Sequence, residues 1–115
     1  MRVVVFGALL VLAVACGEAE FDRARWASGS AAASAERPSH WDNPRAAMVD
    51  DAERAGIAPG ARRAFVRDLL GAPDVERPNL DVYVLGASPY GVDYDEFVVE
   101  YDEAGVVIRA RVVQG

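Results

Sequence analysis

The sequence predicts an α+β fold in which two helices cover one face of a three-stranded antiparallel sheet. Two segments with helical spacing of apolar residues come first, joined by the breaker pair Pro59-Gly60. Three segments with strand-like alternation follow, and strands that are consecutive in the chain can pair as a meander. The element order is therefore α-α-β-β-β, and a length of 115 residues allows one such domain.

The first predicted helix covers residues 44–55. Asn43 or Asp42 can cap its start, and Pro44 suits the first turn because its missing N–H needs no partner there. Gly56 can supply the left-handed residue that ends it. The second predicted helix covers Ala61–Leu70, and Gly71 and Pro73 follow directly as stop signals. Its apolar face consists of Phe65, Val66, Leu69 and Leu70.

The three predicted strands are Leu80–Leu85, Asp95–Tyr101 and Val106–Val113. Residues 102–105 form a hairpin loop between the last two, with glycine where a positive φ is needed. Pairing Tyr101 with Val106 would place Val99 opposite Ile108 and Phe97 opposite Ala110, all on one apolar face. The other face would carry Glu96 and Glu100 beside Arg109 and Arg111.

The N-terminus predicts export and lipid attachment. Residues 1–15 hold one arginine and then thirteen residues without a charge, which as a helix would rise about 20 Å, short of the ~30 Å hydrocarbon core of a membrane. That is the size of a signal peptide. Ala13-Val14-Ala15-Cys16 resembles the lipobox of bacterial lipoproteins, which implies acylation of Cys16. The alternative is a buried or free cysteine after an ordinary secretory signal.

The mature chain would then consist of a lipidated tether, residues 16–41, and a domain, residues 42–115. The tether is rich in Ala, Ser and Gly and could reach roughly 80 Å when extended. Phe21, Trp26 and Trp41 are its exceptions, and could lie at the lipid interface or dock onto the domain. Gly17 stands where an aspartate would resemble an inner-membrane retention signal. We therefore expect the outer membrane of a Gram-negative bacterium, on its periplasmic face.

Composition argues against several classes of function. A net charge of −6, with 18 acidic and 12 basic residues, argues against a nucleic-acid binder. One histidine, His40, and one cysteine cannot form a His/Cys metal cluster, a disulfide or a Cys–His nucleophile pair away from the lipobox. The acidic stretch from Leu80 to Ile108 lacks a calcium-loop motif. We expect no metal, no catalytic residue and no cofactor other than the covalent lipid on Cys16.

The predicted domain resembles the SmpA/OmlA family of small outer-membrane lipoproteins. The resemblance rests on Gly60, Val66 and the run Leu69-Leu70-Gly71-Ala72-Pro73-Asp74, and the sequence is most similar to the stand-alone members, in which a Met-x-x-Asp helix (here Met48–Asp51) precedes that signature. It continues through Tyr83, Gly86, Asp93, Tyr101, Asp102 and Gly105. One departure is the missing capping box of the second helix, where Arg62 and Phe65 replace Ser/Thr and Glu. These residues are expected to build the fold: glycines for turns, and Asp74 bonding turn amides.

The resemblance implies a non-enzymatic module that binds a protein partner in the cell envelope, since the family includes small subunits of the β-barrel assembly machinery. An accessory role in outer-membrane protein assembly or envelope maintenance is the narrower expectation. The alternative is a periplasmic ligand-binding or inhibitory lipoprotein unrelated to barrel assembly. Tyr90 and Tyr94, in and after the loop between the first two strands, are the candidate partner anchors.

Overall fold

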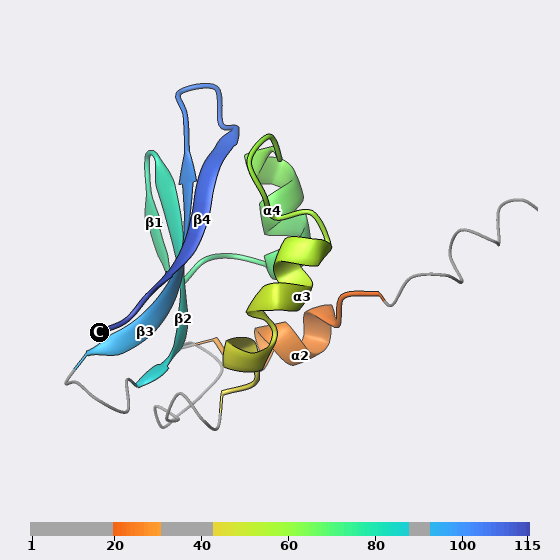
Figure 1. Cartoon of the computed structure of the whole chain (residues 1–115), viewed down its shortest axis with the longest axis vertical. Coiled ribbons are helices and arrows are strands. Elements are labelled where there is room, and N and C mark those ends of the chain that lie inside the picture. Colours follow the sequence, from red (N-terminus) through yellow and green to blue (C-terminus); the bar gives the residue numbers. More distant parts are fainter. Residues whose placement is uncertain (1–19, 31–42, 88–92) are drawn as a thin grey trace, which may run out of the picture.

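The computed structural model describes residues 20–30, 43–87 and 93–115. The predicted signal peptide, Cys16, Trp41 and Tyr90 lie outside the described residues. The fold is α+β, with a four-stranded antiparallel sheet in the order β1-β2-β3-β4 and short helices on one of its faces (Figure 1). The elements are α2 (Arg23–Ala27), a 3-10 helix (Pro44–Ala47), α3 (Val49–Arg54), α4 (Arg63–Leu70), β1 (Val75–Arg77), β2 (Leu80–Ala87), β3 (Tyr94–Tyr101) and β4 (Val107–Val113).

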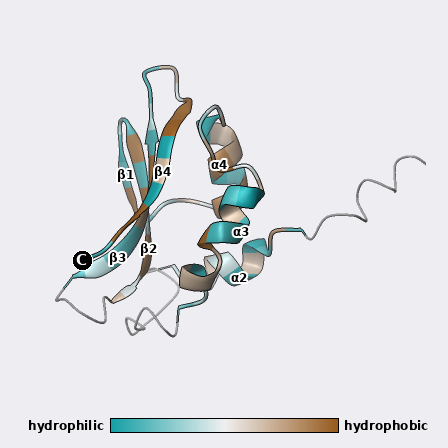
Figure 2. Ribbon diagram, in the orientation of Figure 1, coloured by the Kyte–Doolittle hydropathy of each residue, from teal (hydrophilic) through white to brown (hydrophobic). Residues whose placement is uncertain are grey.

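One hydrophobic core lies between the helices and the sheet. The sheet contributes aromatic and branched side chains from one face of β2 and β3, above all Tyr83, Phe97 and Val99, which are fully buried. Val66 and Leu70 of α4 cover them from the other side. Figure 2 shows that α3 keeps a hydrophilic surface away from the sheet, as expected for a helix that buries only one stripe.

A fourth strand is present that sequence reasoning missed. β1 pairs with β2 across the two-residue turn Pro78-Asn79, and all three of its residues are exposed. Its stabilisation is tertiary, because the guanidinium of Arg63 in α4 donates hydrogen bonds to the carbonyls of Arg77 and Pro78 at 2.7 and 2.8 Å. A three-residue polar segment before a proline gives no such signal in the sequence. The predicted three-stranded meander is therefore wrong by one strand.

Both predicted helices are shorter than expected. Residues 44–55 form a 3-10 turn over Pro44–Ala47 and a separate α3 over Val49–Arg54, with Met48 between them in a non-helical conformation. Asn43 caps the first turn as predicted, accepting a hydrogen bond from the Arg45 N–H. The second helix begins at Arg63 rather than Ala61, since the Gly60 and Arg63 N–H groups bond to β4 and the loop before it and so hold this segment extended.

The predicted register of the last hairpin is wrong. Tyr101 pairs with Val107, and a bulge then shifts the ladder so that Val99 pairs with Ala110 and Phe97 with Val112. The difference from the prediction is two residues from Val99 to Phe97, which keeps Arg109, Ala110 and Arg111 on their predicted faces, whereas a shift of one would exchange the faces. Before the bulge the difference is one residue, and Val107 enters the core instead of the opposite face. Ile108 loses its expected place in the core and is 53% exposed.

Part of the predicted tether packs into the domain. α2 lies among the other helices and contacts α4 and the 3-10 helix. Trp26 is fully buried, with its ring centroid 5.9 Å from that of Tyr83 and 6.2 Å from that of Phe97. Phe21 packs at the edge of the same core. The domain boundary suggested by composition, residue 42, therefore omits a piece of the core.

Candidate functional site

Asp81 is the centre of a buried ionic cluster between the sheet and α4. Its side chain is fully buried, and Oδ1 accepts hydrogen bonds of 2.7 Å from both Arg63 and Arg67. Oδ2 accepts from Nε of Arg67 at 3.1 Å and from the hydroxyl of Tyr101 at 2.9 Å. α4 presents the two arginines one turn apart, so both reach one carboxylate from the same side.

The partners of Asp81 keep it charged. Burial alone would raise the pKa of Asp81, but hydrogen bonds from Arg67, Arg63 and Tyr101 outweigh it and hold the pKa below its ordinary value. The pKa of Tyr101 is raised, first by burial and then by its bond to Asp81. A carboxylate that accepts four hydrogen bonds, three from arginines and one from a tyrosine hydroxyl, is a poor general base. The contacts of this cluster join α4 to the sheet.

A second buried ion pair joins the N-terminal segment to the sheet. Arg45 is 1% exposed, and its Nη1 lies 2.8 Å from Oδ2 of Asp74. Its Nε donates to the carbonyl of Trp26 at 2.8 Å, and its guanidinium lies 5.0 Å from the centre of the Trp26 ring. Burial lowers the pKa of Arg45, and the neighbouring Asp74 opposes that change. This arginine therefore connects α2, the 3-10 helix and the turn after α4.

The family-motif residues take structural positions. Asp74 accepts from the Val84 N–H in β2 as well as from Arg45, rather than only from turn amides. Tyr83 donates from its hydroxyl to the Gly71 carbonyl at 2.8 Å, which ties the end of α4 to β2. Asp102 accepts from the N–H groups of Ala104 and Val106 and so holds the last hairpin.

The motif glycines and the remaining motif residues also take structural positions. Gly60, Gly71 and Gly105 have positive φ in turns, while Gly86 has positive φ at a bulge inside β2 rather than in a turn. Val66, Leu69 and Leu70 are buried in the core, Pro73 is half-buried, and Asp93 is exposed. Four motif residues, Leu70, Gly71, Pro73 and Asp74, line one open pocket of about 550 Å³ at the end of α4.

The candidate partner anchors are only partly visible. Tyr94 is half-buried at the start of β3 and makes its own contacts within the protein. Tyr90 lies outside the described residues. The described residues therefore include one of the two candidate anchors, Tyr94.

The free edge of β4 is a second candidate surface, because an exposed sheet edge can bind a protein partner. Two of the large apolar side chains exposed in the described part of the chain, Ile108 and Val112, lie on this strand, at 53% and 44% exposure. Residues 60–63 cover the start of its edge, where Val107 exchanges hydrogen bonds with Gly60 and Ala61. Beyond that point no described segment pairs with β4 on this side.

Hydrogen-bonding direction alternates along β4. Tyr101 of β3 donates its N–H to the carbonyl of Asn79, so its backbone groups face β2 and not β4. Backbone groups of the alternate residues, Glu100 and Val98, face β4, where these residues pair with Arg109 and Arg111. Backbone groups of Arg109 and Arg111 therefore face β3, and those of Ala110 and Val112 face outward. The last strand of a meander is necessarily an edge, so the sequence did contain the signal for this surface.

Charge on the β4 side chains is arranged around one glutamate. Glu100 accepts from Arg109 at 2.9 and 3.0 Å and from Arg111 at 3.1 Å. The bonds from Arg109 and then Arg111 lower the pKa of Glu100. The sequence predicts Glu96 as well as Glu100 beside these arginines, and in the described part of the chain both arginines pair with Glu100. The two carboxylates of this face lie on β3 and the two exposed guanidinium groups lie on β4, so the positive charge is nearest the free edge.

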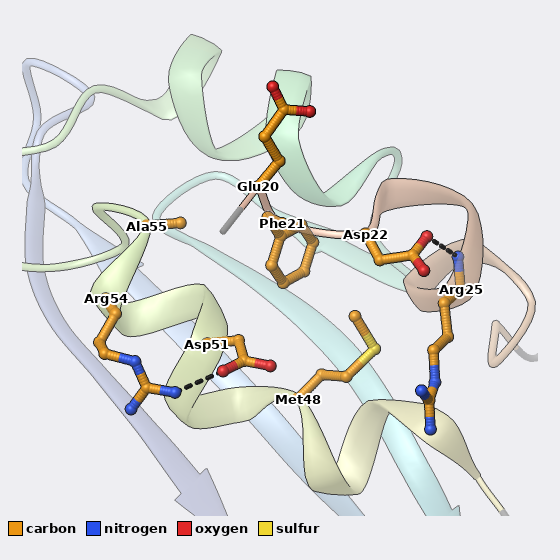
Figure 3. Close-up of a pocket in the computed structure, with 8 residues that line it drawn as sticks. All are labelled: Glu20, Phe21, Asp22, Arg25, Met48, Asp51, Arg54 and Ala55. Carbon is orange, nitrogen blue, oxygen red and sulfur yellow. Dashed lines mark hydrogen bonds and ion pairs between the residues drawn. The ribbon is translucent and has the colours of Figure 1, made fainter. Parts of the chain in front are cut away.

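A cavity of about 300 Å³ lies where the chain enters α2 (Figure 3). Phe21 and Met48 point into it, and charged side chains surround the opening, among them an ion pair of Arg54 with Asp51. This volume is at the lower end of the range for small-molecule pockets, whose linings are mostly apolar. The apolar part of this lining comes from Phe21, Met48 and Ala55.

The described residues contain no group of three or more His, Cys, Asp or Glu side chains that could hold a metal ion. Among the helices in the described ranges, none has the length and apolar character to cross a membrane.

Comparison with known proteins gives no match: no family model, no curated protein and no solved structure is similar to this chain. The SmpA/OmlA resemblance stays a prediction from the motifs.

Proposed function

We propose that this protein is a non-enzymatic, lipid-anchored interaction module of the bacterial cell envelope, and that it binds a protein partner along the free edge of β4. The observation that carries the proposal is the pair of exposed apolar side chains, Ile108 and Val112, on a strand with outward-facing backbone groups. Soluble proteins usually protect such an edge, because it can accept a strand from another chain.

Charge complementarity indicates what the partner contributes. A strand added to β4 would place its side chains beside Arg109 and Arg111 on one face and beside Ile108 and Val112 on the other. Two arginines share one glutamate, so acidic side chains fit the first face and apolar side chains fit the second. The proposed partner element is therefore an extended segment in which acidic and apolar residues alternate.

Attachment through Cys16 to the periplasmic face of the outer membrane is the second part of the proposal. It is supported by the lipobox-like sequence and by the signal-peptide length of the segment before it. The SmpA/OmlA resemblance supports the narrower role of an accessory in barrel assembly or envelope maintenance.

Site-specific photo-cross-linking in living cells tests the binding edge. A benzophenone amino acid replaces Ile108 or Val112 in the processed, tagged full-length protein, and Phe65, an exposed apolar residue on α4, serves as the control position. We expect the same discrete adduct from both edge positions and none from position 65. Mass spectrometry of the adduct then shows whether an acidic and apolar segment was captured, and whether it belongs to the barrel-assembly machinery.

Two matched variants separate strand addition from simple proximity. Val112→Pro removes the outward N–H and should abolish the adduct from position 108, whereas Val112→Thr keeps that donor and the branched shape and should retain it. An adduct at 108 that survives Val112→Pro, or none above the position-65 control, would contradict binding at this edge. A ligand-binding lipoprotein without a protein partner would give no adduct above the position-65 control.

Cys16→Ala tests the anchor. This variant should move to the soluble periplasmic fraction and incorporate no radioactive palmitate, since a multiply acylated cysteine is what holds such a protein on a membrane. A wild-type protein that takes up no palmitate, or a Cys16→Ala variant that still sediments with membranes, would show that the anchor is misassigned.

A further inference from the structure

We infer that the anchor holds this domain in one orientation, with the surface around Glu20, Asp22, Arg25, Asp51 and Arg54 against the lipid headgroups and the sheet on the far side. We call these five residues the anchor-side face. The inference rests on the lipid attachment proposed above and adds to it a specific surface whose occupant is the membrane itself.

The first step is that the chain is fixed to the domain soon after Cys16. Trp26 is fully buried, its carbonyl accepts from Arg45, and Arg23 at the start of α2 lies 3.1 Å from Asp68 of α4. A five-residue helix is unstable alone, so these contacts are what hold α2 in place. Phe21, just before it, already packs against the core.

The second step is chain length. Phe21 is five residue steps after Cys16, and an extended chain covers at most about 3.3–3.6 Å per step, so the Cα atoms of these two residues lie no more than roughly 18 Å apart. A free tether to residue 41 would have allowed about 80 Å. The domain therefore stays next to the membrane surface.

The third step is the direction from which the chain arrives. In Figure 1 residues 20–22, directly before α2, lie on the helical side of the domain, away from the sheet. Figure 3 shows Glu20, Phe21 and Asp22 beside the outer surface of α3, and Asp51 and Arg54 line the same cavity. The side of the molecule nearest the anchor is thus the exposed surface shared by α2 and α3.

The chemistry of the anchor-side face fits headgroups rather than hydrocarbon. All five residues are exposed, and three carboxylates lie among two guanidinium groups. Such a mixed surface complements zwitterionic headgroups, which carry both charges, and the cost of desolvating charged groups keeps it out of the acyl region. The surface needs little affinity of its own, because the acyl chains supply attachment.

Energy transfer from a labelled domain to labelled lipid tests the orientation. Acylation consumes the chain's only native cysteine, so a single added cysteine can be labelled specifically. Asp51→Cys reports from the anchor-side face, and Glu103→Cys reports from the β3–β4 hairpin, at the other end of the sheet (Figure 1). The processed, acylated full-length protein is placed in phosphatidylethanolamine–phosphatidylglycerol vesicles that carry a headgroup acceptor.

We expect a higher transfer efficiency from position 51 than from position 103. Inserting twelve Gly/Ser residues after Gly17 adds about 40 Å of extended reach and should abolish the difference while leaving the protein bound to the vesicles. Equal efficiencies in the uninterrupted chain, or a difference that survives the insertion, would overturn the orientation.

Flotation of the same samples separates this inference from the anchor on which it rests. Acylated protein that floats with the vesicles but shows equal transfer from both positions overturns the orientation alone. A processed wild-type chain that neither takes up palmitate nor floats overturns both. Cys16→Ala, which cannot be acylated, is the matched control and should remain at the bottom of the gradient.

Discussion

Asp81 connects three elements of this domain. It lies in β2, its two arginines come from α4, and its tyrosine comes from the end of β3. Buried ion pairs gain little over apolar residues of equal size, but removing one member leaves the other charges uncompensated. The cluster therefore fixes how α4 lies on the sheet more than it adds to stability.

Asp81→Asn should destabilise the domain by about 3 kcal/mol at pH 7, at the low end for a broken buried pair because Arg63 and Arg67 remain partly exposed. The pKa of Asp81 is lowered on folding, so its contribution is present above the unfolded pKa of about 3.9 and is lost as the pH falls through the folded value. Urea unfolding at several pH values should show a smaller acid dependence below about pH 4 in the variant than in wild type.

Asp68→Asn is the control for this experiment. Asp68 pairs with Arg23 in an exposed position, with side-chain exposures of 69% and 58%, so its loss should change stability by less than about 1 kcal/mol. Equal acid dependence in wild type and Asp81→Asn would show that another carboxylate governs acid unfolding.

Trp26→Ala should cost about 3–5 kcal/mol, since the side chain is fully buried against Tyr83 and Phe97. Its Nε1 has no hydrogen-bond partner among the described residues, so Trp26→Phe gives up contact area only and should recover much of the loss. Thermal unfolding followed by circular dichroism measures both. Phe65→Ala, at an exposed position on α4, should have little effect.

At the scale of elements, the sequence predicts those with strong periodicity and misses those held by tertiary contacts. β2, β3 and β4 follow from alternation, and α4 follows from its apolar face with Gly71 and Pro73 behind it. β1 depends on Arg63 reaching across from α4, and α2 depends on one tryptophan in an Ala- and Ser-rich segment. Neither dependence is visible in local spacing.

The candidate sites also include features that local sequence spacing predicts and features that it does not. The ion pairing of Glu100 with Arg109 and Arg111 could be predicted, because opposite charges alternate on neighbouring strands. The exposure of Ile108 could not, because the bulge beside Tyr101 decides which residue of β4 reaches the core. The Asp81 cluster could not be predicted either, because an aspartate in an aliphatic strand does not indicate that two arginines of α4 bond to it.

Gly71→Ala tests the end of α4. Gly71 has φ of +82° and ψ of −169°, a region that is essentially restricted to glycine, and no atom lies within 4 Å of the position a Cβ would take. The expected loss of about 1–3 kcal/mol is therefore backbone strain without a clash. Denaturant unfolding measures it, and Ala72→Ser at the exposed neighbouring position should be neutral. An unchanged midpoint in Gly71→Ala would show that the turn rearranges at no cost.

For the molecule as a whole, the N-terminal segment is part of the fold. A chain beginning at residue 42 would lack Trp26 and Phe21, and Arg45 would lose its carbonyl acceptor. We expect that chain to lose its cooperative thermal transition, whereas a chain beginning at residue 20 should retain it. Calorimetry of the two compares them directly, and equal transitions would mean that the sheet, α3 and α4 are sufficient.

In the proposed arrangement, attachment and recognition use separate parts of the molecule. The anchor-side face belongs to α2 and α3, while the proposed partner edge belongs to β4 in the sheet layer (Figure 1). Variants on one should leave the other unchanged, so Val112→Pro is expected to float with vesicles as wild type does.

Burial of Trp26 against β2 and β3 also sets an order of events in time. A ribosome makes Trp26 long before Tyr83 and Phe97, so α2 has nothing to pack against until nearly the whole chain has been synthesised. The core can be completed only at the end of synthesis, although Trp26 belongs to one of the first segments made. For the export proposed above this delay would be useful, because a chain that cannot become compact early can still pass unfolded through a translocation channel. Its N-terminus would also stay accessible to the processing enzymes.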